Sequence, residues 1–291
     1  MVASKVLPEG REWTPDRALE VMDRSGTAAA MLSLDTGVYR LGAQRRLNLI
    51  MSSAREFNEF GAKIIADHPG RFGLWALLPL PNVEASLKEI AYAFDTLKAD
   101  GIGIDTSWGD KYIGDPEFIA VLDELNRRKA ILYSHPSPVI SGRHEFPREE
   151  ATTRNILSVL NDAAPKYPNI TFLFSHAGGS MPMIIQRIVG REVAANLDKP
   201  AAPNSKLALL RSFYYDTAQT YNPVAMGALK KVVGTSQILF GTDYLGGTDP
   251  DQAKQVAEGL YTCGVFTPEE VRAIERGNAL RFLPKFNASQ T

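Results

Sequence analysis

The sequence predicts a single α/β domain in which parallel strands alternate with helices around a (β/α)8 barrel that lacks its first strand. Three observations predict this fold: short apolar runs recur along the chain, amphipathic stretches separate them, and polar residues stand at the ends of several runs. Alternating strands and helices require parallel strands joined by crossover connections. The chain of 291 residues is long enough for one such barrel.

Seven runs rich in β-forming residues are the predicted strands. They lie at residues 29–34, 72–80, 101–105, 130–135, 170–176, 213–218 and 238–243. A barrel of this class has eight strands, and the segment before Trp13 is too short and too polar to supply a strand with its loop. We therefore expect one domain over residues 1–291, incomplete at its N-terminus.

Helices are predicted between the strands because apolar residues recur there at helical spacing. The clearest stretches lie at residues 86–99 and 116–128. Thr14 and Thr267 are each followed by proline, the pattern of an N-cap with proline in the first helical turn. Gly26 and Gly101 stand where we expect helices to stop.

Composition and charge exclude several classes of function. The formal net charge is −1 and the charged residues are mixed along the chain, so no basic field for nucleic acid is expected. No stretch approaches the roughly 18 apolar residues of a spanning helix, and the N-terminus has no apolar signal region, so neither membrane insertion nor secretion is expected. The single cysteine, Cys263, fits a reducing compartment and predicts a cytoplasmic protein.

Polar residues at strand ends favour a closed barrel over an open sheet. His135, His176, Asp216 and Asp243 each stand late in an apolar run. In a barrel the carboxyl ends of the strands meet at one mouth, where catalytic groups lie. No G-x-G-x-x-G motif follows an early strand, which removes the commonest reason for a dinucleotide-binding open sheet. We expect His135, His176 and Asp243 to share one cleft.

Several motifs, in order, resemble those of one enzyme group. They are WTPDRALEVMDRSG, DHPGRFGLWALLPLP, LNRRKAILYSHP, FSHAGG, FGTDY and ERGNALRFL. Together they resemble the amidohydrolase-related decarboxylases, the family of aminocarboxymuconate-semialdehyde, γ-resorcylate and 6-methylsalicylate decarboxylases, over about Trp13 to Leu283. The resemblance implies a barrel of the metal-dependent hydrolase type. It also implies metal-dependent, non-oxidative decarboxylation of a small aromatic or enoic carboxylic acid.

The resemblance also implies roles for individual residues. His135 and Asp243 match the family's metal ligands, which implies a zinc or manganese ion, and Asp243 thereby takes part in catalysis. His176 matches the active-site acid–base group. Arg187, eleven positions later, matches an arginine that binds the substrate carboxylate, often across a dimer interface. The family's remaining ligand pair, on its first strand, has no counterpart in this sequence, so we expect weak metal binding.

Each candidate residue also has an ordinary structural interpretation. His135 can be a capped histidine at a strand end, Asp243 a turn aspartate, and His176 a histidine that anchors the following small-residue turn. Arg187 can be a solvated charge on a helix. Trp108 is a candidate for lining the substrate pocket, although a lone aromatic residue more often packs in a core.

Three functional hypotheses therefore remain at this point. The first is the decarboxylase, which the family motifs favour. The second is a metal-dependent hydrolase or lactonase on the same scaffold, since fold alone does not choose between them. The third is a catalytically impaired, truncated homologue that binds a ligand without turnover. For the enzyme we expect a small carboxylated substrate and a homodimer or higher homo-oligomer.

Overall fold

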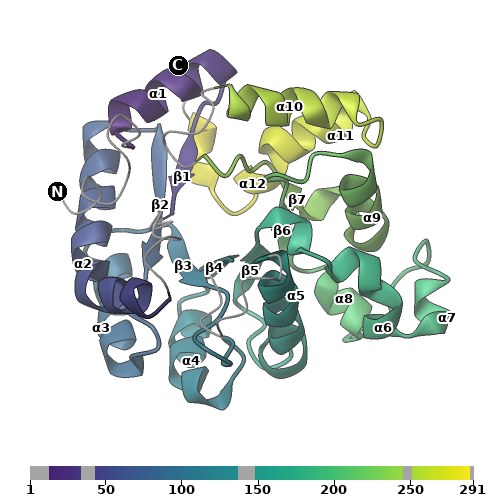
Figure 1. The fold of residues 1–291 in the computed structure, drawn as a ribbon, viewed down its shortest axis with the longest axis horizontal. Helices are drawn as coiled ribbons and strands as arrows, with labels where there is room; N and C mark the ends of the chain where they lie inside the picture. Colours follow the sequence, from purple (N-terminus) through teal and green to yellow (C-terminus); the bar gives the residue numbers. More distant parts are fainter. Residues whose placement is uncertain (1–12, 34–42, 137–147, 245–250, 289–291) are drawn as a thin grey trace.

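The computed structural model describes residues 13–33, 43–136, 148–244 and 251–288. These residues contain one parallel sheet of seven strands in the order β1 to β7, and each strand pairs with the next along the chain. The strands curl around a common centre, and the helices lie outside them (Figure 1). The strands are β1 (Ala30–Leu32), β2 (Phe72–Leu77), β3 (Gly101–Asp105), β4 (Ile131–His135), β5 (Thr171–Phe174), β6 (Tyr214–Asp216) and β7 (Ile238–Leu239). All seven predicted strands are confirmed.

Helices occupy the segments between the strands. They are α1 (Pro15–Ser25), α2 (Ala43–Asp67), α3 (Val83–Asp95), α4 (Ile119–Arg127), α5 (Arg148–Ser158), α6 (Ile185–Val189), α7 (Arg191–Ala194), α8 (Lys206–Leu210), α9 (Pro223–Val233), α10 (Gln252–Thr262), α11 (Pro268–Arg272) and α12 (Asn278–Leu280). None of the described helices is long and apolar enough to cross a membrane.

The helix boundaries follow the predicted signals, with one exception. The Thr14 side chain caps α1 by accepting from the backbone N–H of Arg17, and Gly26 ends that helix in the left-handed region with φ = 71°. Thr267 forms a capping box at the start of α11. The expected helix stop at Gly101 is wrong, because α3 already ends at Asp95 and Gly101 begins β3.

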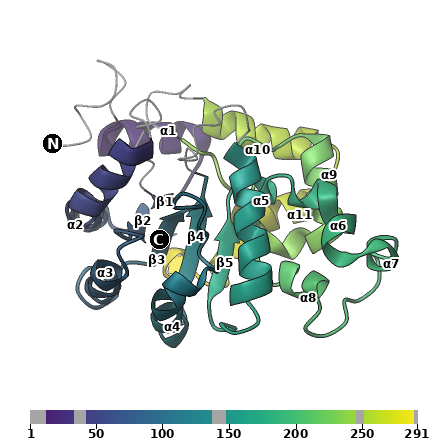
Figure 2. The same ribbon diagram turned by 60° about the horizontal axis from the view of Figure 1, so that its bottom comes forward.

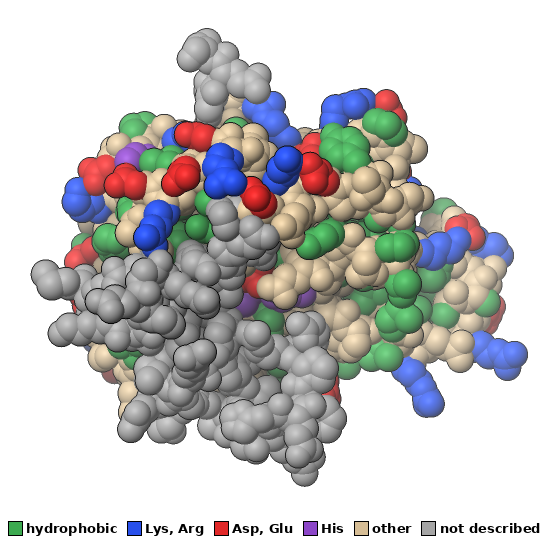
Figure 3. All heavy atoms as spheres, turned by 45° about the horizontal axis from the view of Figure 1, so that its top comes forward, with side chains coloured by type: hydrophobic (Ala, Val, Ile, Leu, Met, Phe, Trp, Pro, Cys, Tyr) green, Lys and Arg blue, Asp and Glu red, His purple; other side chains and the backbone are tan. Residues whose placement is uncertain are grey.

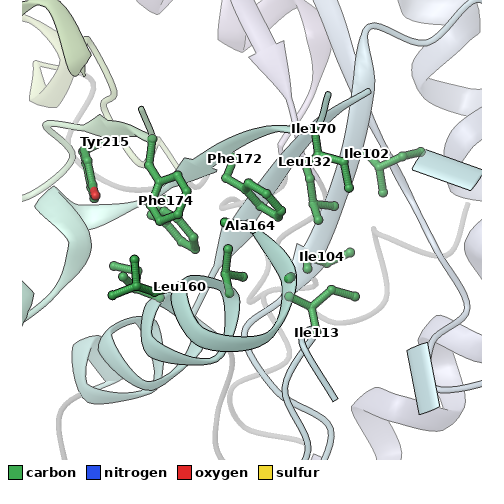
Figure 4. Packing of buried hydrophobic residues seen from close by; sticks show 14 of the residues in the cluster. Ile102, Ile104, Ile113, Leu132, Leu160, Ala164, Ile170, Phe172, Phe174 and Tyr215 are labelled. Carbon is green, nitrogen blue, oxygen red and sulfur yellow. The ribbon is translucent and has the colours of Figure 1, made fainter. Parts of the chain in front are cut away.

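The outer face of the sheet packs against the surrounding helices. Alternate strand residues point outward because successive side chains of a strand face opposite sides. Figure 4 shows Leu132, Phe172 and Phe174 from the strands next to Leu160 and Ala164 of the segment that continues α5. All five side chains are buried. Removing such apolar surface from water is the main favourable term in folding.

The inner face of the sheet forms a second, smaller cluster. Trp75, Ile131, Leu173 and Leu239 from four strands meet there with Leu283 of the C-terminal segment. That segment lies at the amino ends of the strands: Lys285 binds Asp100, the residue just before β3. The C-terminal segment therefore closes the end of the barrel that lies opposite the strands' carboxyl ends.

Glycines in β3 make room for the Trp75 ring inside the barrel. An ideal Cβ on Gly101 would lie 2.8 Å from Cζ3 of Trp75 and 2.7 Å from the carbonyl oxygen of Ile131. A Cβ on Gly103 would lie 3.2 Å from Cβ of Trp75. Gly101 is thus required by the packing of a strand interior, and not by the end of a helix.

The sheet is open between its two edge strands. Within the described residues, β1 pairs only with β2 and β7 pairs only with β6. Outside this seam α1 contacts α10 (Figure 2), and Arg24 forms an ion pair with Asp251 at 2.6 Å. Seven parallel strands with one opening fit a (β/α)8 barrel that is short of one strand, as the sequence predicts.

A side chain of α2 takes the place of a strand partner at the end of β2. The amide group of Asn58 accepts from the Leu77 N–H at 2.7 Å and donates to the Leu77 carbonyl at 2.9 Å. It also donates to Glu89 of α3 at 2.8 Å, and Glu89 accepts from Arg55 as well. Asn58 is 1% exposed, so these bonds satisfy polar groups that are shielded from water.

Candidate metal and catalytic site

The structure brings His135, His176 and Asp243 together at the carboxyl ends of the strands. The Nε2 atoms of the two histidines are 3.1 Å apart, and Nε2 of His135 lies 3.4 Å from Oδ1 of Asp243. Their three potential ligand atoms all lie within 4.8 Å of one another. Histidine (purple) and acidic (red) side chains are visible at the centre of the face seen in Figure 3. The three side chains that were expected in one cleft therefore lie together at the mouth of the barrel.

The hydrogen bonds of His176 define its tautomer. Its Nδ1 lies 3.0 Å from the carbonyl oxygen of Ala218. A carbonyl oxygen can only accept, so Nδ1 carries the proton in this bond. In the neutral ring, Nε2 then has a free lone pair, which faces Nε2 of His135.

A divalent cation fits this set of donors. Two imidazole nitrogens and one carboxylate oxygen are ligands that suit zinc and manganese. Both measured separations are shorter than about 4.2 Å, twice a typical metal–nitrogen bond length, so one ion can contact His135 together with either partner. All three ligand atoms lie within 4.8 Å of one another. The Nε2 lone pair of His176 lies 3.1 Å from Nε2 of His135, a separation at which a proton or a cation can lie between the two nitrogens.

His176 begins a turn with an unusual backbone. Four successive residues have positive φ: His176 (52°), Ala177 (55°), Gly178 (75°) and Gly179 (64°). Residues other than glycine adopt this region at a cost. At Gly178 an added Cβ would also lie 3.0 Å from the ring of Tyr215. The small residues after His176 are thus explained by backbone conformation and close packing.

Asp243 is also held in a left-handed conformation, with φ = 53°. Its Oδ2 accepts a hydrogen bond from Nε2 of Gln219, a residue that itself has φ = 54°. This leaves Oδ1 toward His135. Gln219 was not predicted from the sequence, although its position just after the β6 run is a weak signal for a residue at the barrel mouth.

Asp216 lies next to His176 and is not one of the three candidate metal ligands. Its Oδ1 accepts from the backbone N–H of His176 at 2.8 Å and of Ala218 at 3.0 Å. Its Oδ2 accepts from the hydroxyl of Tyr133 at 3.3 Å. Burial raises the pKa of the Asp216 carboxyl, while the neighbouring His176 and these N–H donors act in the opposite direction.

The two residues expected to bind substrate, Arg187 and Trp108, are not among the candidate metal ligands. Arg187 is exposed on α6, and no ion pair of its side chain is found among the described residues. Trp108 is buried, with its ring 5.0 Å from that of Phe118 in the outer core. Of the two other histidines, His68 packs edge-on against Phe72, and His144 lies outside the described residues.

A small recess lies beside His135 in the barrel interior. Trp75, Tyr133 and Asp105 line it together with His135, and its volume is about 20 Å³. Asp105 is the register partner of His135 on the neighbouring strand. A space of this size holds about one water molecule, so it is a small hollow next to the candidate ligands.

Comparison with known proteins places this site in a family context. A family model for amidohydrolases matches residues 8–285. The decarboxylase yanB of Aspergillus niger is 30% identical over 94% of this chain and 80% of its own length. The 6-methylsalicylic acid decarboxylase of Penicillium expansum is 29% identical over 80% of this chain and 75% of its own length.

Solved structures share the fold. The dihydroxybenzoic acid decarboxylase of a Polaromonas species matches 99% of this chain and 93% of its own, with a TM-score of 0.78 and 20% sequence identity. That structure contains bound manganese and the inhibitor 2-nitroresorcinol. At this level of identity the match supports the barrel architecture.

Proposed function

The chain belongs to the amidohydrolase family, and from this premise we propose that it is a metal-dependent, non-oxidative decarboxylase of small aromatic carboxylic acids. The observation that carries the proposal is the convergence of His135, His176 and Asp243 on one position at the barrel mouth. The curated relatives cited above are decarboxylases of this scaffold. This favours carbon–carbon cleavage over the hydrolase and lactonase alternative.

In this proposal His135 and Asp243 hold a zinc or manganese ion. Once held there, such an ion would attract an anionic substrate and would stabilise the negative charge that develops in the transition state. Gln219 keeps one oxygen of Asp243 occupied, so the other is directed toward His135. The convergence of these donors supports the assignment, and manganese in the related structure supports the choice of metal.

In the proposed reaction His176 delivers the proton to the ring carbon that loses CO2. The bond from the ring to the carboxylate breaks, its electron pair stays on the ring carbon, and a proton replaces the departing CO2. Nδ1 of His176 is engaged with Ala218, so Nε2 is the atom available to carry that proton. The same lone pair is the one that a metal would use, so His176 can serve as proton carrier or as third ligand.

Carbon dioxide release tests the reaction. The full chain, with added zinc or manganese, is incubated with 6-methylsalicylic acid, with 2,6-dihydroxybenzoic acid and with an aromatic lactone. We expect CO2 and the decarboxylated arene from at least one acid, and no lactone hydrolysis. Hydrolysis without CO2 would move the assignment to the lactonase.

Metal analysis separates the two roles of His176. The wild type and the variants His135→Ala, Asp243→Ala and His176→Ala are dialysed against a series of zinc or manganese concentrations, and the bound ion is measured at each, because weak binding is expected even in the wild type. We expect the first two variants to lose the ion. If His176→Ala keeps the ion but loses at least about two orders of magnitude in rate, it carries the proton; if it loses the ion, it is the third ligand.

We propose that the protein forms a homodimer or higher homo-oligomer in which Arg187 binds the carboxylate in a neighbouring subunit. Support comes from apolar side chains exposed near α6: Met183 is 66% and Ile184 is 37% exposed, and Val224 at the start of α9 is 66% exposed. Hydrophobic side chains gather on the right of the molecule in Figure 3. Exposed apolar surface of this kind is typical of subunit contacts.

Sedimentation and kinetics test the oligomer. We expect Met183→Asp to give monomers in sedimentation. Arg187→Ala should raise KM. Arg191 is an exposed arginine on α7, and Arg191→Ala should leave KM unchanged. A wild-type monomer at micromolar concentration would remove Arg187 from a cross-subunit role.

We also propose a cytoplasmic location, supported by the single cysteine.

A further inference from the structure

We propose that Asp216 is the positioning residue that fixes the tautomer and the orientation of His176. Asp216 is 7% exposed at the end of β6, and neither of its oxygens belongs to the group of candidate metal ligands. The inference rests on the proposed function only for its catalytic consequence. The arrangement itself follows from hydrogen bonds between groups of the chain itself.

One oxygen of Asp216 takes part in a closed ring of hydrogen bonds with His176 and Ala218. Oδ1 accepts from the backbone N–H of His176 and from that of Ala218. The carbonyl of Ala218 in turn accepts from Nδ1 of the His176 ring. The carboxylate thus places the His176 backbone and also the carbonyl that selects the Nδ1–H tautomer.

The second oxygen and the surrounding packing hold the carboxylate in place. Oδ2 accepts from Tyr133, which lies on β4 two residues before His135. On the other side, an ideal Cβ at Gly241 would lie 2.8 Å from Cβ and 2.9 Å from Cγ of Asp216. Glycine at position 241, two residues before Asp243, therefore leaves the room that Asp216 needs. The carboxylate contacts the segments that carry all three candidate ligands.

The backbone of His176 explains why such an anchor is needed. With φ = 52°, His176 occupies a region that residues other than glycine seldom adopt. A charge-assisted bond from its N–H to a buried carboxylate stabilises this conformation. Without it the turn is free to relax, and the Nε2 lone pair is no longer directed at Nε2 of His135. Both roles considered for His176 depend on that direction.

Ring-nitrogen NMR measures the tautomer directly. The chain contains four histidines, so 15N-histidine labelling of the full chain gives few signals, which His176→Gln assigns. In chelator-treated wild type we expect His176 to have a protonated Nδ1 and an unprotonated Nε2. An Nε2–H tautomer, or fast exchange between the two tautomers, would overturn the proposal without any variant of Asp216.

Variants then test the source of that tautomer. Asp216→Ala should give averaged ring-nitrogen shifts for His176 and at least a tenfold loss of kcat. Asp216→Asn, whose amide oxygen can still accept from both N–H groups, should restore the tautomer. Asp100→Ala is the matched control, because Asp100 also accepts from a backbone N–H, that of Leu74, but at the opposite end of the barrel.

The outcomes distinguish this inference from the proposed function. Wild-type ring shifts in Asp216→Ala would refute the positioning role even if the enzyme is active. Absence of CO2 release with the expected shift change would refute the decarboxylase and leave the positioning role intact. If Asp216→Ala does not fold, the wild-type tautomer and Asp216→Asn still decide the question.

Discussion

Replacing Gly178 by alanine tests whether the turn after His176 is as tightly packed as the structure indicates. Gly178 has φ = 75°, which costs an L-residue about 1–2 kcal/mol. Its new Cβ would lie 3.0 Å from two ring carbons of Tyr215 and 3.1 Å from Cδ1 of Ile156. Both neighbours are fully buried, and each must shift by a few tenths of an ångström to admit the new Cβ.

The magnitude follows from these two contributions. Overpacking of a core typically costs about 1–3 kcal/mol, so Gly178→Ala should lower the free energy of unfolding by about 2–5 kcal/mol in total. Gly264→Ala is the control, because Gly264 has φ = 71° and nothing lies within 4 Å of its ideal Cβ. It should cost only the backbone contribution of about 1–2 kcal/mol.

Urea unfolding of both variants gives the comparison, since a shift of the midpoint at constant slope reports the change in stability. Because Gly178 lies two residues after His176, its variant should also lose decarboxylase activity while Gly264→Ala keeps it. Equal stability of the two variants would refute the close contact between the turn and Tyr215. Equal activity would show that the turn does not control His176.

Three further predictions concern other parts of the molecule. Asn58→Ala should lower the free energy of unfolding by about 2–4 kcal/mol in chemical denaturation, since it leaves the N–H and C=O of Leu77 without their buried partner. Hydrogen bonds from the Arg127 side chain lower the pKa of Glu124 from 4.5 to about 2. A depressed carboxyl pKa stabilises the fold above pH 4.5, and this stability is lost as pH falls toward 2, so unfolding titrations should show a smaller loss for Glu124→Gln. Zinc or manganese at 100 times its Kd should stabilise the protein by about 2.7 kcal/mol, which raises the melting temperature. His135→Ala should abolish this rise in thermal melts.

Much of the fold was predictable because its signals are local. Each strand is a short apolar run, and several helices begin at a recognisable cap, so both can be found without knowing tertiary contacts. Gly101 shows where local reasoning fails. A glycine after a helical stretch resembles a helix stop, whereas here it makes room for Trp75, which lies 26 residues earlier in the sequence.

The candidate site was predictable to the extent that it follows strand ends. His135 and Asp243 close apolar runs, and a barrel brings such ends together. The bonds that orient the site come from side chains of other segments. Gln219, which follows β6, binds Asp243, and Tyr133 of β4 binds Asp216, which accepts from the His176 backbone. No spacing in the sequence specifies such pairs, because they arise only when β4, β6 and the segment after β7 are in register.

The open seam of the barrel and the candidate metal site are physically connected. Asp243 follows β7, a strand of two residues at the edge of the sheet, so few backbone bonds fix its position. The next residue, Tyr244, packs across the seam against the cluster that contains Ala18 and Met22 of α1. Contacts between α1 and α10 hold the same region from outside. Loosening α1 should therefore displace Asp243 before His135, whose strand is paired on both sides, and the affinity for metal should fall before the barrel itself unfolds.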